Sequence, residues 1–104
     1  MKKIRLVCAA GMSTSLITTR IQQEIAKRGL DYEVTATTAN TALQEIDAGK
    51  IDVDCILVAP QVRFQVKEFE KKTDIPVGLV DMLAYGRIDT KAILNQAIGL
   101  MGEE

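Results

Sequence analysis

Short apolar runs alternate along this chain with longer segments in which apolar residues recur every three or four positions. The short runs are rich in Val, Ile and Leu, as strands are, and the longer segments have the spacing of one helical face. The pattern predicts, in chain order, a strand at about 3–8, a helix at 13–28, a strand at 31–37, a helix at 41–49, a strand at 54–59, a helix at 61–72, a strand at 75–80 and a helix at 90–101.

The ends of the predicted helices carry residues that cap or stop helices. Ser13 or Thr14 can cap the start of the first helix, and Gly29 stops it. In the second helix, Thr41 and Gln44 have the spacing of a capping box.

The strand at 54–59 indicates how the sheet is built. Its sequence, DCILVA, is continuously apolar, as expected of a central parallel strand that is covered on both faces. Strands that alternate with helices form a parallel sheet with helices on both faces, and right-handed crossovers leave few topologies. We therefore expect a single α/β domain, 1–104, with a four-stranded parallel sheet in the order 2-1-3-4, a small flavodoxin-like arrangement.

Chemistry-bearing residues follow the strands of this predicted sheet. Cys8 ends the first strand, Pro60 and Gln61 follow the third, and Asp81 ends the fourth. Ligands of such sheets bind beyond the carboxyl ends of the strands, near the switch point between strands 1 and 3. We expect these residues to meet at one edge.

Composition removes several classes of function. The balance of 13 basic and 14 acidic residues, a net charge of −1, argues against binding to nucleic acid. The chain has no histidine, which excludes a Ser-His-Asp triad, and two cysteines are too few for a zinc site. No apolar run approaches the ~18 residues of a membrane span, and no cleavable signal pattern is present. We expect a cytoplasmic protein that requires no metal and no cofactor.

The segment that begins at Cys8, CAAGMSTS, carries the strongest chemical signal. Small residues allow successive backbone N–H groups to point inward, and Gly11 can adopt a positive φ. Such a nest before a helix binds an oxyanion and lowers the pKa of a thiol below its free value of about 8.5. We predict Cys8 as a nucleophile. The predicted phosphate-binding residues are Ala9, Ala10, Gly11, Met12, Ser13, Thr14 and Ser15.

A structural interpretation of Cys8 stays open at this point, because a cysteine at a strand end is often a small apolar residue. Cys55 lies within an apolar run without a loop beside it, and we predict that it is a core residue. No disulfide is expected between the two cysteines. About four residues at ~3.3 Å each separate their levels in the sheet, whereas the Cα atoms of a disulfide lie within ~7 Å.

Three motifs make the chain resemble a known family. They are CAAGMSTSLI after the first strand, APQV after the third and DMLAYGRID after the fourth. Together they are similar to the IIB component of the bacterial phosphoenolpyruvate-dependent sugar phosphotransferase system, in its lactose/cellobiose/chitobiose class. The likeness covers essentially the whole chain, and the cysteine loop is its most specific part.

This resemblance implies a phosphoryl carrier. A phosphohistidine on a IIA partner passes its phosphoryl group to Cys8, and the phosphocysteine passes it to a sugar that the membrane component IIC carries. The absence of histidine from this chain agrees with that role, because the imidazole that donates the phosphoryl group belongs to the IIA partner. The resemblance also implies that Gln61 donates to the phosphoryl group, that Tyr85 lines the docking rim, and that the carrier is a monomer. Ala10, Met12 and Leu16 would form an apolar rim for transient docking.

Low-molecular-weight tyrosine phosphatases have a similar strand, loop and helix, with the pattern C-x5-R-S. Thr14 stands here at the arginine position and Ser15 follows it. Arginine clamps phosphoryl oxygens and stabilises the charge of the transition state, so its absence favours holding a phosphoryl group over hydrolysis. Arg63 and Arg87 are either substitutes for this arginine or solvated surface cations.

Asp81 has three interpretations: a general acid, as in the phosphatases, a residue that orients the loop, or a cap for the next segment. Two other functions also stay open for the whole chain, a phosphatase-like hydrolase and a non-catalytic anion-binding regulatory module. A thiol-based reductase would need a second cysteine near Cys8, and Cys55 is wrongly placed for that.

Overall fold

The computed structural model describes residues 1–9 and 15–103. Its strands are β1 (Lys2–Cys8), β2 (Tyr32–Thr38), β3 (Cys55–Val58) and β4 (Val77–Leu79). Its helices are α1 (Ser15–Lys27), α2 (Ala39–Asp47), α3 (Val66–Lys72), α4 (Met82–Arg87) and α5 (Thr90–Met101), and a 3-10 helix, η1 (Pro60–Gln65), precedes α3.

The four strands form one parallel sheet in the order β2-β1-β3-β4, which confirms the predicted topology. Because β1 is a central strand, its carboxyl end is held from both sides. Cys8 pairs with Thr38 of β2, and the N–H of Ala59, just after β3, donates to the carbonyl of Val7 at 2.9 Å. The end of β1 is therefore a fixed point in the middle of one sheet edge.

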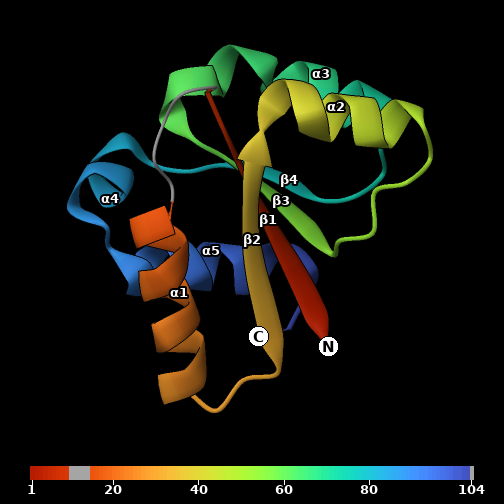
Figure 1. The fold of residues 1–104 in the computed structure, drawn as a ribbon. Helices are drawn as coiled ribbons and strands as arrows, with labels where there is room; N and C mark the ends of the chain where they lie inside the picture. Colours follow the sequence, from red (N-terminus) through yellow and green to blue (C-terminus); the bar gives the residue numbers. More distant parts are fainter. Residues whose placement is uncertain (10–14, 104) are drawn as a thin grey trace.

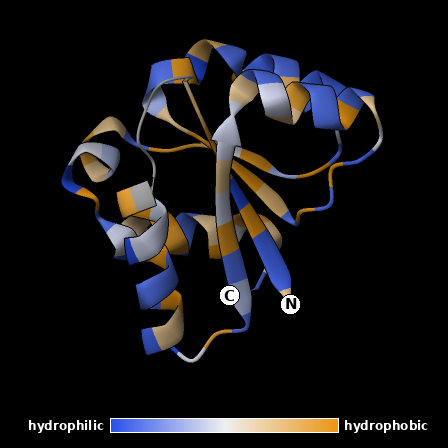
Figure 2. Ribbon diagram, in the orientation of Figure 1, coloured by the Kyte–Doolittle hydropathy of each residue, from blue (hydrophilic) through white to orange (hydrophobic). Residues whose placement is uncertain are grey.

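Helices cover both faces of the sheet (Figure 1). Figure 1 shows α2 and α3 on one face and α1 and α5 on the other. Each face has its own buried apolar cluster: Ile4, Leu6 and Leu57 pack with α1 and α5, whereas Ile56 and Phe69 belong to the cluster beneath α2 and α3. Figure 2 shows β3 in hydrophobic colours, while the helices carry both hydrophobic and hydrophilic positions. Within the described residues, no helix is long and apolar enough to cross a bilayer.

Two predicted helix starts differ from the structure. The predicted cap at Ser13 or Thr14 lies outside the described residues. The capping box of Thr41 and Gln44 is wrong, because α2 begins at Ala39. The strand β2 runs directly into this helix, and the hydroxyl of Thr38 accepts from the Thr41 N–H at 3.2 Å.

The predicted helix at 61–72 is divided in two. Pro60 occupies the first turn of η1, and Val62 has the non-helical angles φ −119° and ψ 26°. The regular helix α3 starts only at Val66. Val62 and Phe69 are nevertheless buried, so the predicted apolar face is correct where it meets the core.

The helix α4 was not predicted. It has six residues, too few for an apolar period to be visible, and four of its positions are exposed: Met82, Leu83, Gly86 and Arg87. The position of Asp81 also differs from the prediction. The strand β4 ends at Leu79, so Asp81 does not end the strand but precedes α4.

Candidate functional site

Cys8 lies at the carboxyl edge of the sheet and is almost fully buried. Its side chain is 3% exposed, and its Sγ donates to the carbonyl oxygen of Thr37 over 3.5 Å. The backbone of Cys8 is fixed by β2 and β3, as described above, so the sulfur has a defined place. A buried sulfur takes part in chemistry only if an open space reaches it.

A pocket of about 170 Å³ provides such a space on the side of α2. Its described lining consists of Cys8, Ala9, Thr38, Ala39, Asn40, Val62 and Gln65. A water molecule occupies about 30 Å³ in the liquid, so the pocket has room for a phosphoryl group with some water. A buried cysteine thus lines a small, partly polar cavity.

The predicted cradle is only partly described. Ala9 lines the pocket beside Cys8, and Ser15 is the first residue of α1. The remaining cradle residues, Ala10, Gly11, Met12, Ser13 and Thr14, lie outside the described residues.

Cys55 has a very different environment. It begins β3 opposite Ile4, four residues before the level of Cys8. It is fully buried, and burial, with a smaller contribution from the charge of Asp54, raises the pKa of its thiol to about 12. Neither cysteine forms a disulfide. The prediction that Cys55 is a core residue without a disulfide to Cys8 is confirmed.

Asp81 caps α4, which carries Tyr85. Its carboxylate accepts from the N–H groups of Leu83 and Ala84, both at 3.1 Å. Tyr85 is half-buried and packs against both apolar clusters. Burial, and to a smaller extent the charge of Cys8, raises the pKa of the Tyr85 phenol, so this ring lies within electrostatic reach of the sulfur.

The segment after β3 places its two glutamines differently. Pro60 is buried, and its carbonyl accepts from the Arg63 guanidinium at 2.9 Å. Gln61 is exposed and is absent from the described lining of the Cys8 pocket, whereas Gln65, one turn later, is part of it. Sequence reasoning missed Gln65.

The two candidate arginines both belong to the surface. Arg63 and Arg87 are exposed, and Arg63 is tied to its own turn by its bond to Pro60. Apart from Met1, the large apolar side chains that are more than half exposed in the described part of the chain lie on elements that start at the carboxyl edge of the sheet. They are Leu16 on α1, Phe64 in η1, and Met82 and Leu83 on α4.

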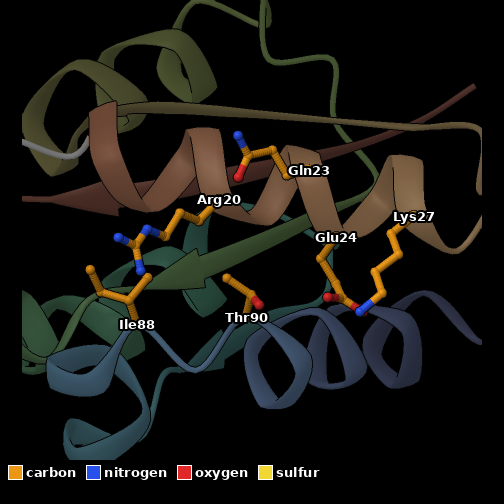
Figure 3. Close-up of a pocket in the computed structure, with 6 residues that line it drawn as sticks. All are labelled: Arg20, Gln23, Glu24, Lys27, Ile88 and Thr90. Carbon is orange, nitrogen blue, oxygen red and sulfur yellow. The ribbon is translucent and has the colours of Figure 1, made fainter.

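A larger pocket, of about 460 Å³, lies between α1 and the turn from α4 to α5 (Figure 3). It is lined by Arg20, Gln23, Glu24, Lys27, Ile88 and Thr90. A hydrogen bond from Arg28 lowers the pKa of Glu24, and the same guanidinium donates to Asn95 of α5 at 2.7 Å. No cysteine lines this pocket among the described residues, so we assign the chemistry to the smaller one. The described residues also contain no group of three or more Cys, Asp or Glu that could hold a metal ion.

Comparison with known proteins agrees with this geometry. The family model described as "PTS system, Lactose/Cellobiose specific IIB subunit" matches residues 3–96. The oligo-beta-mannoside-specific EIIB component of Bacillus subtilis is 36% identical over 104 residues, covering 97% of both chains. The cellobiose-specific EIIB component of Lactococcus lactis subsp. lactis is 38% identical over 104 residues, covering 96% of both chains.

Solved structures give the same result. The solution structure of a cellobiose-specific phosphotransferase IIB component from Borrelia burgdorferi has a TM-score of 0.76 at 30% identity, covering 97% of this chain and 92% of that one. The lactose-specific IIB domain from Streptococcus pneumoniae has a TM-score of 0.75 at 17% identity, covering 92% and 94%, and shows the shared fold. The chain therefore belongs to the lactose/cellobiose-specific IIB subunit family of the sugar phosphotransferase system, and it is a phosphotransferase of sugar uptake.

Proposed function

We propose that Cys8 carries a phosphoryl group from the phosphohistidine of a IIA protein to a sugar that a IIC membrane component holds. The observation that supports this most is the pocket at Cys8. Cys8, which is 3% exposed, lines a cavity large enough for a phosphoryl group, at the carboxyl edge where ligands of such sheets bind.

Two displacements at phosphorus make up the reaction. In the first, the Cys8 thiolate attacks phosphorus, the S–P bond forms, and the N–P bond of the phosphohistidine breaks with its electron pair returning to the imidazole nitrogen. In the second, a sugar hydroxyl oxygen attacks phosphorus, its proton passes to solvent, and the S–P bond breaks to restore the thiolate. The phosphocysteine is the covalent intermediate, and the chain acts as a kinase-type transferase.

The cradle of this intermediate is the P-loop-like segment from Ala9 to Ser15. Its backbone N–H groups would surround the phosphoryl oxygens at the start of α1, and hydroxyls of Ser13, Thr14 and Ser15 would add donors. Thr14 stands where a phosphatase has arginine. Without the guanidinium, the transition state for attack by water is less stabilised, so the phosphoryl group persists until a sugar arrives.

The way in which the partners bind follows from the presence of a single carrier sulfur. IIA and IIC must both reach Cys8, so they bind in turn and not together. The exposed apolar rim of Leu16, Phe64, Met82 and Leu83 suits transient docking at this edge. We further propose that residues 1–104 form one cytoplasmic, monomeric IIB domain that visits the membrane only through IIC.

The proposed sugar is a β-glucoside or related disaccharide such as cellobiose, chitobiose or lactose. The cellobiose-specific relative supports this class, whereas the names of two other relatives specify oligo-beta-mannoside and galactose.

Intact-mass spectrometry tests the proposal. The chain is mixed with phosphoenolpyruvate, the general phosphotransferase proteins and a candidate IIA, and we expect the mass of one added phosphoryl group. Cys8→Ser should abolish the adduct, whereas the matched Cys55→Ser variant, once shown to be folded, should keep it. Rapid hydrolysis of an aryl phosphate would favour the phosphatase alternative instead, and a cognate-class IIA that gives no adduct would contradict the carrier function.

A further inference from the structure

Gln65 stands at a position where a glutamine has no evident structural task. It is the N-cap residue of α3, and its side chain makes no capping hydrogen bond. Ser, Thr, Asp and Asn stabilise such positions, because their short side chains reach the first free N–H groups, and glutamine is not among these residues. Capping of α3 therefore does not account for Gln65.

The side chain of Gln65 instead borders the pocket at Cys8. Val62, one turn earlier in η1, is 5% exposed and lines the same pocket, so η1 is held against the core at this point. The same pocket is lined by Thr38, the N-cap residue of α2, and by Asn40 in the first turn of that helix. The Thr38 hydroxyl is engaged as the cap of α2, whereas the Gln65 amide has no hydrogen-bond partner among the described residues.

An amide at this place has a chemistry that suits a phosphocysteine. Its NH₂ group offers donors to phosphoryl oxygens. Hydrogen bonds from a neutral donor are about half as strong as those from a charged one, so an amide stabilises the phosphoryl group less than an arginine would. This weaker stabilisation suits a carrier, which must release the phosphoryl group to the sugar.

We propose that Gln65 is a catalytic residue of this carrier, whose side-chain amide donates a hydrogen bond to an oxygen of the phosphoryl group on Cys8. This inference rests on the proposed function. It concerns a different glutamine from Gln61, the donor that the family resemblance implied, and it rests on Gln65 being the one that lines the pocket.

The first measurement is independent of any carrier function. The pH profile of Cys8 alkylation by iodoacetamide is recorded for wild type, Gln65→Glu and the control Gln44→Glu, which changes an exposed glutamine on α2. A carboxylate in the pocket disfavours the thiolate, so Gln65→Glu should shift the profile to higher pH. Gln44→Glu should leave it unchanged. An unshifted profile for Gln65→Glu would place the side chain away from the sulfur and overturn the proposal.

The second measurement is transfer itself, followed as phosphocysteine formation from phosphorylated IIA for Gln65→Leu, Gln61→Leu and Gln44→Leu. Loss of one hydrogen bond worth about 1.4 kcal/mol in the transition state corresponds to about tenfold slower transfer for Gln65→Leu. Gln44→Leu should transfer at the wild-type rate, Gln61→Leu tests the donor that the family resemblance implied, and urea unfolding should show all three variants to be folded.

The outcomes separate the two proposals. A wild-type protein that accepts no phosphoryl group contradicts the proposed function, and the role of Gln65 falls with it. A wild-type protein that works, together with an equally fast Gln65→Leu, overturns the role of Gln65 alone. A slower Gln61→Leu beside a fast Gln65→Leu would restore the donor that the sequence suggested.

Discussion

Replacing Asp81 by alanine removes the N-cap of α4. The carboxylate accepts from Leu83 and Ala84, both at 3.1 Å, and the side chain is exposed. Loss of an N-cap costs about 1 kcal/mol, with a range of roughly 0.5–2 kcal/mol, so the free energy of unfolding should fall by about that amount. The melting temperature should fall by about 4–8 °C, as expected for a domain of this size.

Asparagine at the same position distinguishes a role of Asp81 as a helix cap from a role as a general acid. Asn caps a helix about as well as Asp, so Asp81→Asn should lose only a few tenths of a kcal/mol in urea unfolding. It should also accept a phosphoryl group from IIA at the wild-type rate, because it retains the geometry of α4 and of Tyr85. Asp89 is a matched control, since it caps α5 through one bond to Ala92 at 3.1 Å, and Asp89→Ala should cost a similar amount.

Two results would refute this reasoning about Asp81. Equal destabilisation by Asp81→Asn and Asp81→Ala would show that the carboxylate charge, and not the cap, matters for stability. A folded Asp81→Asn that transfers phosphoryl groups about a hundredfold more slowly would show that Asp81 takes part in the chemistry, because general acid–base catalysis contributes roughly 10²–10⁴-fold.

Four further predictions concern Cys55, Tyr85 and Gly78. The pKa of Cys55 is raised from 9.0 to about 12, so native alkylation at neutral pH should label Cys8 alone, as peptide mapping will show. As the pH rises, the Cys55 thiol loses its proton in the unfolded chain before it does so in the folded chain. The free energy of unfolding should therefore fall between pH 9.0 and about pH 12, by up to ~1.4 kcal/mol per pH unit. Cys55→Ala should reduce this slope. The pKa of Tyr85, read by ultraviolet absorbance in a Tyr32→Phe background, should lie above its ordinary value and fall partway back in Cys8→Ser. Gly78→Ala should destabilise the fold by about 1–3 kcal/mol in urea unfolding, because the new Cβ would lie 2.7 Å from a leucine methyl group of α5; an unchanged stability would show that this side chain moves aside freely.

The sheet could be predicted because a strand that is buried on both faces consists almost entirely of apolar residues. The continuous apolar run of β3 and the alternation of runs with helical spacings led to the order β2-β1-β3-β4. The position of Cys8 followed from the same logic, since it is the last residue of a central strand before a loop of small residues. These features depend on short-range patterns that the fold cannot easily override.

The features that were missed depend on three-dimensional context. Thr41 and Gln44 matched the capping pattern, but β2 extends to Thr38, and Thr38 caps α2 three residues earlier than predicted. Gln61 and Gln65 are chemically identical, but Gln65, which follows the kink at Val62, is the one in the described lining of the pocket. Such choices depend on how the turn after β3 packs, and residue spacing alone does not determine that.

The most direct test of the account follows the phosphoryl group through a complete transfer. The chain is phosphorylated with radiolabelled phosphate through IIA, purified, and added to membranes that contain the cognate IIC, with and without the sugar. We predict that the label stays on the protein without sugar and moves to the sugar as a phosphate ester when sugar is added. Release of the label as inorganic phosphate, at the same rate with and without sugar, would contradict the claim that Cys8 holds the group for transfer.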